Sequence, residues 1–193
     1  MRKAKVYIAL LHYPVYNKKM EIVTTSVTNL DLHDIARVAR TYDVEKFFIV
    51  HPYDNQHGLL KEIVSYWQDG YGGTYNPDRK EAFTILAPIN TLEEAKEEIA
   101  LKTGKEVIVV STDAKTHFNT VTYKRLKSEI YEEEQVFLIL FGTGWGLQAE
   151  LLEESDYILE PIEKDRSYNH LSVRSAVAII LDRLLGEYWF QGE

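Results

Sequence analysis

Short apolar runs rich in β-branched and aromatic residues alternate along this chain with segments of helical period, and no other feature restricts its fold as strongly. The runs predict buried strands at 5–12, 46–52, 83–89, 106–113, 135–141 and 157–162. Between them, apolar residues recur every three to four positions, as in 31–44, where Leu32, Ile35 and Val38 share one helix face. This alternation predicts an α/β domain with a mainly parallel sheet of about six strands flanked by helices.

The chain is long enough to bury one sizeable core. It has 193 residues, 45% of them hydrophobic, and no linker or change of composition divides it, so we expect a single domain over 1–193. The segment 69–82, DGYGGTYNPDRKEA, is rich in turn residues and predicts a long loop. A long helix over 167–189 is expected to close the chain.

Composition excludes several classes of protein. The absence of cysteine excludes disulfides, thiolate metal sites and cysteine nucleophiles, and the histidines lack metal-ligand spacing, so no metal is expected. The apolar runs fall well short of the ~20 residues that a membrane span needs, and the N-terminus is typical of a strand rather than a signal peptide. We therefore expect a cytoplasmic protein without membrane contact. The net charge of −8 argues against a general coat for nucleic acids.

The stretch 140–147, LFGTGWGL, places three glycines directly after a predicted buried strand. It differs from the dinucleotide fingerprint GxGxxG because Leu147 stands where the third glycine belongs and the motif follows the fifth strand rather than the first. No Lys-Ser or Lys-Thr pair follows, which excludes a P-loop, and no GxSxG is present. Two interpretations remain: a turn whose backbone approaches a ligand closely, or a turn that only connects a strand to a helix.

The order of three motifs resembles that of the SPOUT superfamily of RNA methyltransferases. The motifs are Arg37 on the helix after the first strand, the glycine stretch, and Glu160-Pro-Ile162 followed by Ser167-Tyr-Asn169. The resemblance covers 5–52 and 106–187. The chain is similar in character to a bacterial group of S-adenosylmethionine (SAM)-dependent RNA methyltransferases related to the C-terminal domain of tRNA guanine-N1-methyltransferase. The family's asparagine six residues before the arginine is replaced by an aspartate, which leaves the target atom open.

The resemblance implies a C-terminal trefoil knot, SAM as cofactor, tRNA or rRNA as substrate, and a homodimer. The backbone of three adjacent loops would then grip the cofactor. The residues implied are Thr112, Phe141, Gly142, Thr143, Gly144, Gly146, Leu159, Pro161, Ile162, Tyr168, Asn169, Leu171 and Ser172. The alternative function is a SAM-binding or nucleotide-binding module without catalysis, and an oxidoreductase of flavodoxin-like or Rossmann type is a third hypothesis.

Arg37 is the candidate catalytic residue, with Asp34 one helical turn before it as the group that orients its guanidinium. A guanidinium is a poor general base, so binding a phosphate or steering the acceptor is the easier role. The alternative is an exposed helix arginine paired with Asp34 or Glu45. Asp165 and His170 are alternative proton acceptors, or solvated loop residues.

The sequence also predicts the surroundings of Arg174 and His33, which lie in two predicted helices. Arg174 falls in the first turn of an apolar helix, where a cation is unfavourable, so an anion such as Glu160 or a ligand carboxylate should lie nearby. His33 lies off the face of Arg37 and is expected to be an ordinary surface histidine.

Aromatic and basic residues that could contact RNA occur in two segments. They are Tyr71, Tyr75, Arg79 and Lys80 in the predicted loop, and Lys115, Lys124, Arg125 and Lys127 farther along. A charged, solvated face is the alternative for the second group. The cluster Tyr188, Trp189 and Phe190 near the end of the chain is expected to contribute to the dimer, or to fold back onto its own core.

Overall fold

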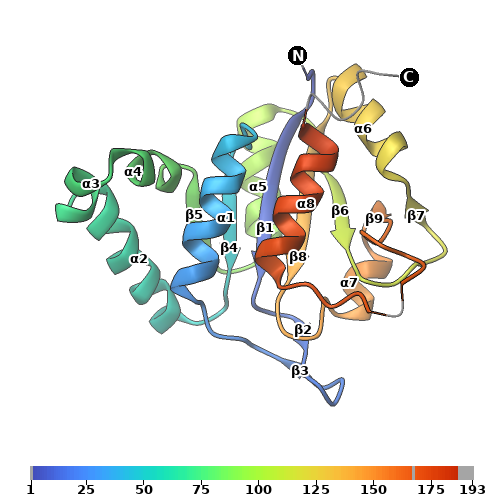
Figure 1. Ribbon diagram of the computed structural model, residues 1–193, viewed down its shortest axis with the longest axis horizontal. Coiled ribbons are helices and arrows are strands. Elements are labelled where there is room, and N and C mark those ends of the chain that lie inside the picture. Colours follow the sequence, from blue (N-terminus) through green and yellow to red (C-terminus); the bar gives the residue numbers. More distant parts are fainter. Residues whose placement is uncertain (1, 167, 187–193) are drawn as a thin grey trace.

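The computed structural model describes residues 2–166 and 168–186, and its centre is a sheet of seven parallel strands (Figure 1). The strand order across the sheet is β5-β4-β1-β8-β6-β9-β7. The bounds are β1 Lys5–Leu11, β4 Phe47–Val50, β5 Leu86–Ile89, β6 Ile108–Thr112, β7 Thr120–Val121, β8 Val136–Gly142 and β9 Tyr157–Leu159. The predicted α/β class and parallel sheet are confirmed. The strand that the prediction lacks, β7, has two residues at the sheet edge, too few for a periodic signal.

Helices cover both faces of the sheet. They are α1 Asn29–Thr41, α2 Asp54–Gln68, α3 Tyr71–Tyr75, α4 Pro77–Phe83, α5 Leu92–Thr103, α6 Tyr123–Glu132, α7 Ala149–Glu153 and α8 Val173–Leu185. Alternate residues of β1 belong to two separate hydrophobic cores. Val6, Ile8 and Leu10 pack with α1, α6 and α8 on one face of the sheet. Tyr7, Ala9 and Leu11 pack with α5 and α7 on the other. Burial on both faces explains why the strands appear as continuous apolar runs.

Polar side chains at its start and a glycine at its end determine the bounds of α5. The hydroxyl of Thr91 accepts a hydrogen bond from the backbone N–H of Glu94, and Gly104 ends the helix with a φ of 67°. The carboxylate of Glu94 accepts a hydrogen bond from the backbone N–H of Asn90 (3.1 Å) rather than from Thr91. The cap therefore satisfies two backbone donors at the start of the helix.

The predicted loop 69–82 is wrong, because this segment forms α3 and most of α4. Asn76 caps α4 by accepting a hydrogen bond from the backbone N–H of Arg79 at 2.9 Å, and Pro77 occupies the first helical position. Gly72 is buried, and a Cβ there would lie 2.6 Å from the ring of Tyr66. The glycine that resembles a turn signal is thus required for α3 to pack on α2.

The last helix begins later than predicted. Ser172 caps α8 by accepting a hydrogen bond from the backbone N–H of Ser175, and the helix starts at Val173. A short antiparallel hairpin, β2 Val15–Tyr16 with β3 Ile22–Val23, follows β1 and was not predicted. The cluster Tyr188, Trp189 and Phe190 lies outside the described residues. Within the described chain, none of the helices combines the length and apolarity that a bilayer span requires.

Candidate cofactor and active site

The three loops predicted to form the cofactor slot meet at the carboxyl edge of the sheet. Their strands β6, β8 and β9 are neighbours and run parallel, so their ends lie side by side. The hydroxyl of Thr112 donates a hydrogen bond to the carbonyl of Leu140 (2.8 Å), and Thr112 pairs with Leu159 across the ladder. Asn169 Nδ2 donates to the carbonyl of Ala114 (3.1 Å), which brings the loop after β9 to the loop after β6.

The predicted cofactor residues differ in what they can offer a ligand. The side chains of Phe141 and Leu159 are buried in the core, so only their backbone is available. A cavity of about 270 Å³ lies beside α8 and includes Ile162, Tyr168, Asn169 and Leu171 in its wall, together with Arg183 and other residues. The glycine turn does not line this cavity, so the predicted residues occupy two adjoining surfaces rather than one pocket.

Different physical reasons favour glycine at each of the three glycine positions of the turn. A Cβ at Gly142 would lie 2.9 Å from the backbone nitrogen of Leu147, and a Cβ at Gly144 would lie 2.7 Å from the carbonyl oxygen of Tyr16. Gly144 and Gly146 have φ values of 60° and 105°, which favour glycine. A Cβ at Gly146 would meet no atom within 4 Å. The face beside Gly146 is therefore open.

Several backbone groups of the turn form hydrogen bonds inside the protein, two of them with the hairpin. The N–H of Trp145 donates to the carbonyl of Tyr16 (2.8 Å), and the N–H of Tyr16 donates to the carbonyl of Gly146 (2.9 Å). The N–H of Thr143 donates to the carbonyl of Leu11 (3.3 Å). Within the described chain, the N–H of Gly144 has no such partner. A spare backbone donor next to an open face fits the polar edge of a nucleoside.

A partly buried hydrogen-bond chain, which was not predicted from the sequence, supports the turn. The hydroxyl of Thr143 donates to the carbonyl of Leu11 (3.0 Å), so in its 2.6 Å contact with Thr25 the Thr25 hydroxyl must be the donor. With its proton used there, Thr25 can only accept from His12 Nδ1 at 2.9 Å. His12 therefore carries its proton on Nδ1, and its buried Nε2 is an acceptor without a hydrogen-bond partner in the described chain.

His12 and His51 are both fully buried and neutral at pH 7. Burial, with a smaller contribution from His51, lowers the pKa of His12 to about 4. His51 Nδ1 accepts from the N–H of Tyr53 (3.1 Å), so its Nε2–H donates to the carbonyl of Thr25 (3.1 Å). Burial also lowers the pKa of His51. Each histidine lies at or near the end of a predicted strand and directly follows an observed one, β1 or β4, and this position was the available sequence signal.

Asp34 does not pair with Arg37. Its Oδ2 lies 3.7 Å from Nε of Arg174, and Asp31 Oδ1 lies 3.6 Å from the same guanidinium. The expectation of an anion beside Arg174 is confirmed, but Glu160 is the wrong partner, because its carboxylate accepts from the backbone N–H of Tyr123 (2.7 Å). The helices α1 and α8 pack together, which the sequence pattern could not place.

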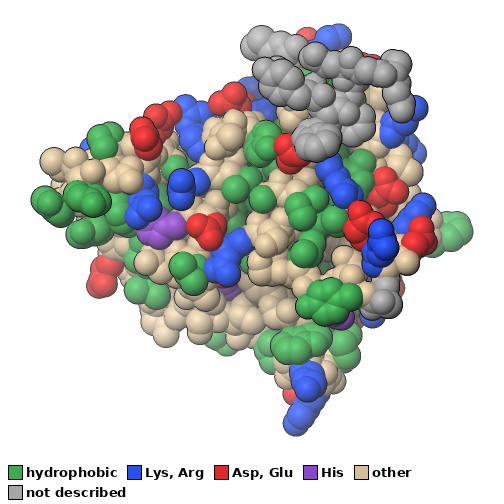
Figure 2. Space-filling model, in the orientation of Figure 1, with side chains coloured by type: hydrophobic (Ala, Val, Ile, Leu, Met, Phe, Trp, Pro, Cys, Tyr) green, Lys and Arg blue, Asp and Glu red, His purple; other side chains and the backbone are tan. Residues whose placement is uncertain are grey.

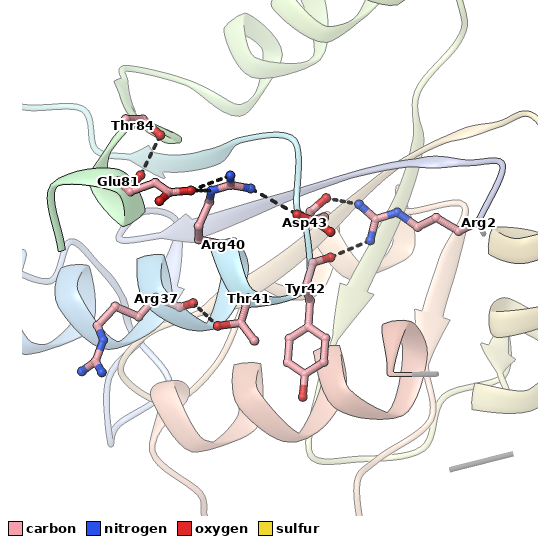
Figure 3. A network of polar contacts seen from close by, with 8 residues as sticks. All are labelled: Arg2, Arg37, Arg40, Thr41, Tyr42, Asp43, Glu81 and Thr84. Carbon is pink, nitrogen blue, oxygen red and sulfur yellow. Dashed lines mark hydrogen bonds and ion pairs between the residues drawn. The ribbon is translucent and has the colours of Figure 1, made fainter. Parts of the chain in front are cut away.

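Arg37 is exposed, and its guanidinium makes no hydrogen bond or ion pair with the described residues, Glu45 included. Figure 3 shows its side chain directed away from the network that joins Arg40 to Glu81 and Asp43. Its backbone carbonyl accepts a hydrogen bond from the hydroxyl of Thr41 (2.8 Å). The guanidinium is thus available to an external anion.

The expectation for His33 is wrong. The residue is half-buried, with its ring centroid 5.1 Å from that of Trp67 and 4.7 Å from that of Phe83. Burial is the main cause that lowers the pKa of His33, and the charge of Arg79 lowers this pKa further. The cause is that α2 and α4 fold over this part of α1, which a helical period alone does not reveal.

Some of the candidate RNA-contacting residues are exposed, and others already interact with groups of the protein itself. Tyr71 and Tyr75 are exposed and stack on each other at 6.2 Å. Arg79 lies over the ring of Trp67 at 4.8 Å and is half-buried, and Arg125 pairs with Glu129. Lys127 donates to backbone carbonyls at the end of α8. Lys80, Lys115 and Lys124 are exposed.

Comparisons with known proteins show the family to which this chain belongs. The model of a family described as SAM-dependent RNA methyltransferase matches residues 5–186. An uncharacterized protein of Aquifex aeolicus is 46% identical over 184 residues, covering 95% of this chain and 90% of that protein. A tRNA (guanine-N(1)-)-methyltransferase of Oleidesulfovibrio alaskensis is 41% identical over 94% of this chain, which spans 42% of that protein.

Among solved structures, the SpoU methyltransferase AviRb of Streptomyces viridochromogenes, crystallised in complex with the cofactor AdoMet, has a TM-score of 0.57. Its identity is 14%, and the match covers 96% of this chain and 58% of that one, so the likeness concerns the fold. The family model spans nearly all of the sequence and the Aquifex relative nearly all of both chains. This chain belongs to the family of SAM-dependent RNA methyltransferases.

Proposed function

We propose that the protein transfers a methyl group from SAM to RNA at the carboxyl edge of β6, β8 and β9. The observation that carries the proposal is the meeting of the three loops there, with the open glycine face and the spare N–H of Gly144. The proposed cofactor residues are those of the three loops that the sequence predicted. The AdoMet complex of a protein with the same fold supports this choice of cofactor.

The proposed roles follow from what each group can do. Bound SAM would supply an activated methyl group with a good leaving group, so the protein mainly aligns the acceptor with the methyl carbon. Backbone groups at the turn would hold the nucleoside, since the neighbouring side chains Phe141 and Leu159 are buried. Arg37, exposed and without an ion-pair partner in the described chain, would bind an RNA phosphate. Asp34 would act on Arg37 only through their shared helix, because it pairs with Arg174.

The RNA class is proposed at the level of tRNA or rRNA. The name of the Oleidesulfovibrio relative favours tRNA, but this chain spans less than half of that protein, which leaves its nucleotide and atom open. An enzyme acting on such RNA would work in the cytoplasm, and fractionation of tagged protein tests that location. A SAM-binding module without catalysis is the competing outcome of the assay below.

We also propose a homodimer that forms at this edge. Large hydrophobic side chains are exposed around the loops, namely Tyr13, Met20, Ile22, Trp145, Tyr168 and Leu171. Figure 2 shows hydrophobic side chains gathered over the β2–β3 hairpin. A patch of this kind is unusual on a monomer. Sedimentation that gives only a 22.4 kDa species at micromolar concentration would contradict the dimer.

A knotted single domain completes the proposal. Strand β8 lies between β1 and β6, and β9 lies between β6 and β7, so late strands enter between early ones. The segment after β9 contacts Ala114 before α8 packs on α1, which supports threading through the earlier loop. Pulling the two ends apart in an optical trap tests it. A knotted chain stays shorter than the ~3.4 Å per residue of a fully extended one.

The test of function separates binding from catalysis. Titration calorimetry with SAM measures binding, and transfer of tritium from methyl-labelled SAM to total RNA of a strain lacking the gene measures catalysis. Binding with transfer supports the enzyme, and binding without transfer to any RNA fraction supports the binding module. Absence of SAM binding contradicts both.

A further inference from the structure

The loop 113–119, which follows β6, contains a histidine paired with an aspartate. His117 Nε2 lies 2.6 Å from Asp113 Oδ2. All six histidines of the sequence are in the described residues, and His117 is the one hydrogen-bonded to a carboxylate there. Neither residue is among the site residues predicted from the sequence, because the loop between them carries no recognised motif.

Both members of the pair are held in place by backbone hydrogen bonds. The N–H of His117 donates to the hydroxyl of Thr120 (2.8 Å), and that hydroxyl donates to the carbonyl of His117 (2.7 Å). The other carboxylate oxygen of Asp113 accepts from the N–H of Ala114 (2.6 Å). These bonds hold the backbone of His117 and the carboxylate of Asp113, and the contact between Nε2 and Oδ2 orients the ring on the carboxylate.

The pairing determines which ring nitrogen is free. An ionised carboxylate only accepts hydrogen bonds, so the proton of the neutral His117 ring lies on Nε2. Nδ1 then carries a lone pair and has no hydrogen-bond partner in the described chain. The His117 side chain is 30% exposed, which leaves part of it open to solvent. An oriented imidazole with a free lone pair and a carboxylate behind it is the arrangement of a general base.

The pair also lies beside the proposed slot. Asp113 directly follows Thr112, and Asn169 donates a hydrogen bond to the carbonyl of Ala114 in this loop. The loop further presents Phe118, fully exposed, and the exposed Lys115, an aromatic and a cation that suit an unpaired nucleotide. By contrast, Asp165 is exposed without an ion pair or hydrogen bond in the described chain, and the exposed His170 has only a ring contact with Tyr168.

We propose that His117 is the proton acceptor of the methyl transfer and that Asp113 orients it, an inference that rests on the proposed function. The acceptor nitrogen or oxygen of the nucleotide attacks the methyl carbon of SAM. A bond forms to that carbon while the carbon–sulfur bond breaks, and its electron pair stays on sulfur, giving S-adenosylhomocysteine. The proton of the acceptor moves to Nδ1 of His117, and Asp113 stabilises the resulting imidazolium.

The test uses the full chain and single-turnover transfer of labelled methyl from bound SAM to total RNA of the strain lacking the gene. His117→Ala should lower the rate by about 100-fold or more. Calorimetry should give SAM affinity within about twofold of wild type, because a general base acts in the transition state. Added imidazole should restore part of the rate, which a merely structural histidine would not allow. Asp113→Asn should lower the rate in the same direction.

Different results would contradict the role of His117 and the proposed function. Wild-type rates in His117→Ala, or a loss of rate that follows a loss of SAM affinity, overturn the assignment while leaving the proposed function intact. The same holds if His170→Ala, and not His117→Ala, loses the chemical step. If the wild-type protein transfers no methyl group to any RNA, the proposed function and this inference fail together.

Discussion

At the scale of single residues, Thr25 joins the glycine turn to the buried histidines through two hydrogen bonds. Thr25→Val keeps the shape but leaves the Nδ1–H of His12 without an acceptor. A buried unpaired donor costs about 1–3 kcal/mol, so we expect that loss of unfolding free energy and weaker SAM binding. Thr25→Ser should restore both. Thr24→Val is the control for chemical denaturation and calorimetry, because Thr24 is a half-buried neighbour whose side chain forms no hydrogen bond with the described residues. Equal stability of Thr25→Val and Thr24→Val would contradict the hydrogen-bond chain.

The buried His12 predicts a pH dependence of stability. Its folded pKa of about 4 lies below the ordinary value of 6.5, so between these values the unfolded chain binds a proton that the folded chain does not. Stability should therefore fall as pH drops from 6.5 to 4, by at most about 1.4 kcal/mol per pH unit from this group. His33 and His51 act in the same direction. Denaturation of His12→Asn across this range should give a smaller slope, and an unchanged slope would show that His12 is not the group.

Arg37 and Arg40 lie on the same helix but have different surroundings. Arg40 pairs with Glu81 and Asp43, whereas Arg37 has no ion pair in the described chain (Figure 3). Arg37→Ala should fold normally and bind SAM, yet transfer methyl to RNA about 100-fold more slowly, as expected for loss of a positioning contact. Arg40→Ala should keep wild-type transfer and lose at most about 1 kcal/mol of stability. Equal single-turnover rates in wild type and Arg37→Ala would make Arg37 an ordinary surface residue.

At the scale of elements, the glycines of α2 and α3 offer a matched comparison. A Cβ at Gly72 would lie 2.6 Å from the Tyr66 ring and 2.8 Å from that of Trp67, whereas a Cβ at Gly58 meets no atom within 4 Å. Gly72→Ala should destabilise the protein by about 1–3 kcal/mol through overpacking. Gly58→Ala should stabilise it by up to about 1 kcal/mol, because alanine favours the helix. Thermal unfolding of the two variants checks the order, and a stabilised Gly72→Ala would show that α3 does not pack on α2 in this way.

The elements also show what a sequence can predict. The strands were found because β1 and its neighbours are buried on both faces, which leaves long apolar runs. The helices α3 and α4 were missed because their glycines and proline are also turn formers, and only the packing of Gly72 on Tyr66 distinguishes the two roles. The position of Gly144 could likewise be recognised from the sequence. The reason that a glycine is required there is the nearby carbonyl of Tyr16 in the hairpin, and this contact depends on tertiary structure.

At the scale of the whole molecule, the order of the motifs was sufficient to indicate the family, while the contacts between helices were not predictable. The partner of Arg174 was sought along the chain at Glu160 and lies instead on α1, because α1 and α8 pack side by side (Figure 1). The His12–Thr25–Thr143 chain likewise joins the N-terminal part of the chain to Thr143, which lies 118 positions after Thr25. Such pairs depend on topology, which periodicity does not contain.

Transfer of a methyl group from SAM to RNA by this chain can be measured with a radioactive label. Purified protein is incubated with methyl-labelled SAM and total RNA of a strain lacking the gene, and label in the RNA is counted against heat-denatured protein. We expect label that accumulates with time in one tRNA or rRNA species and a rate that falls about 100-fold with Arg37→Ala. Label at the level of the denatured control, with SAM binding intact, would contradict this expectation.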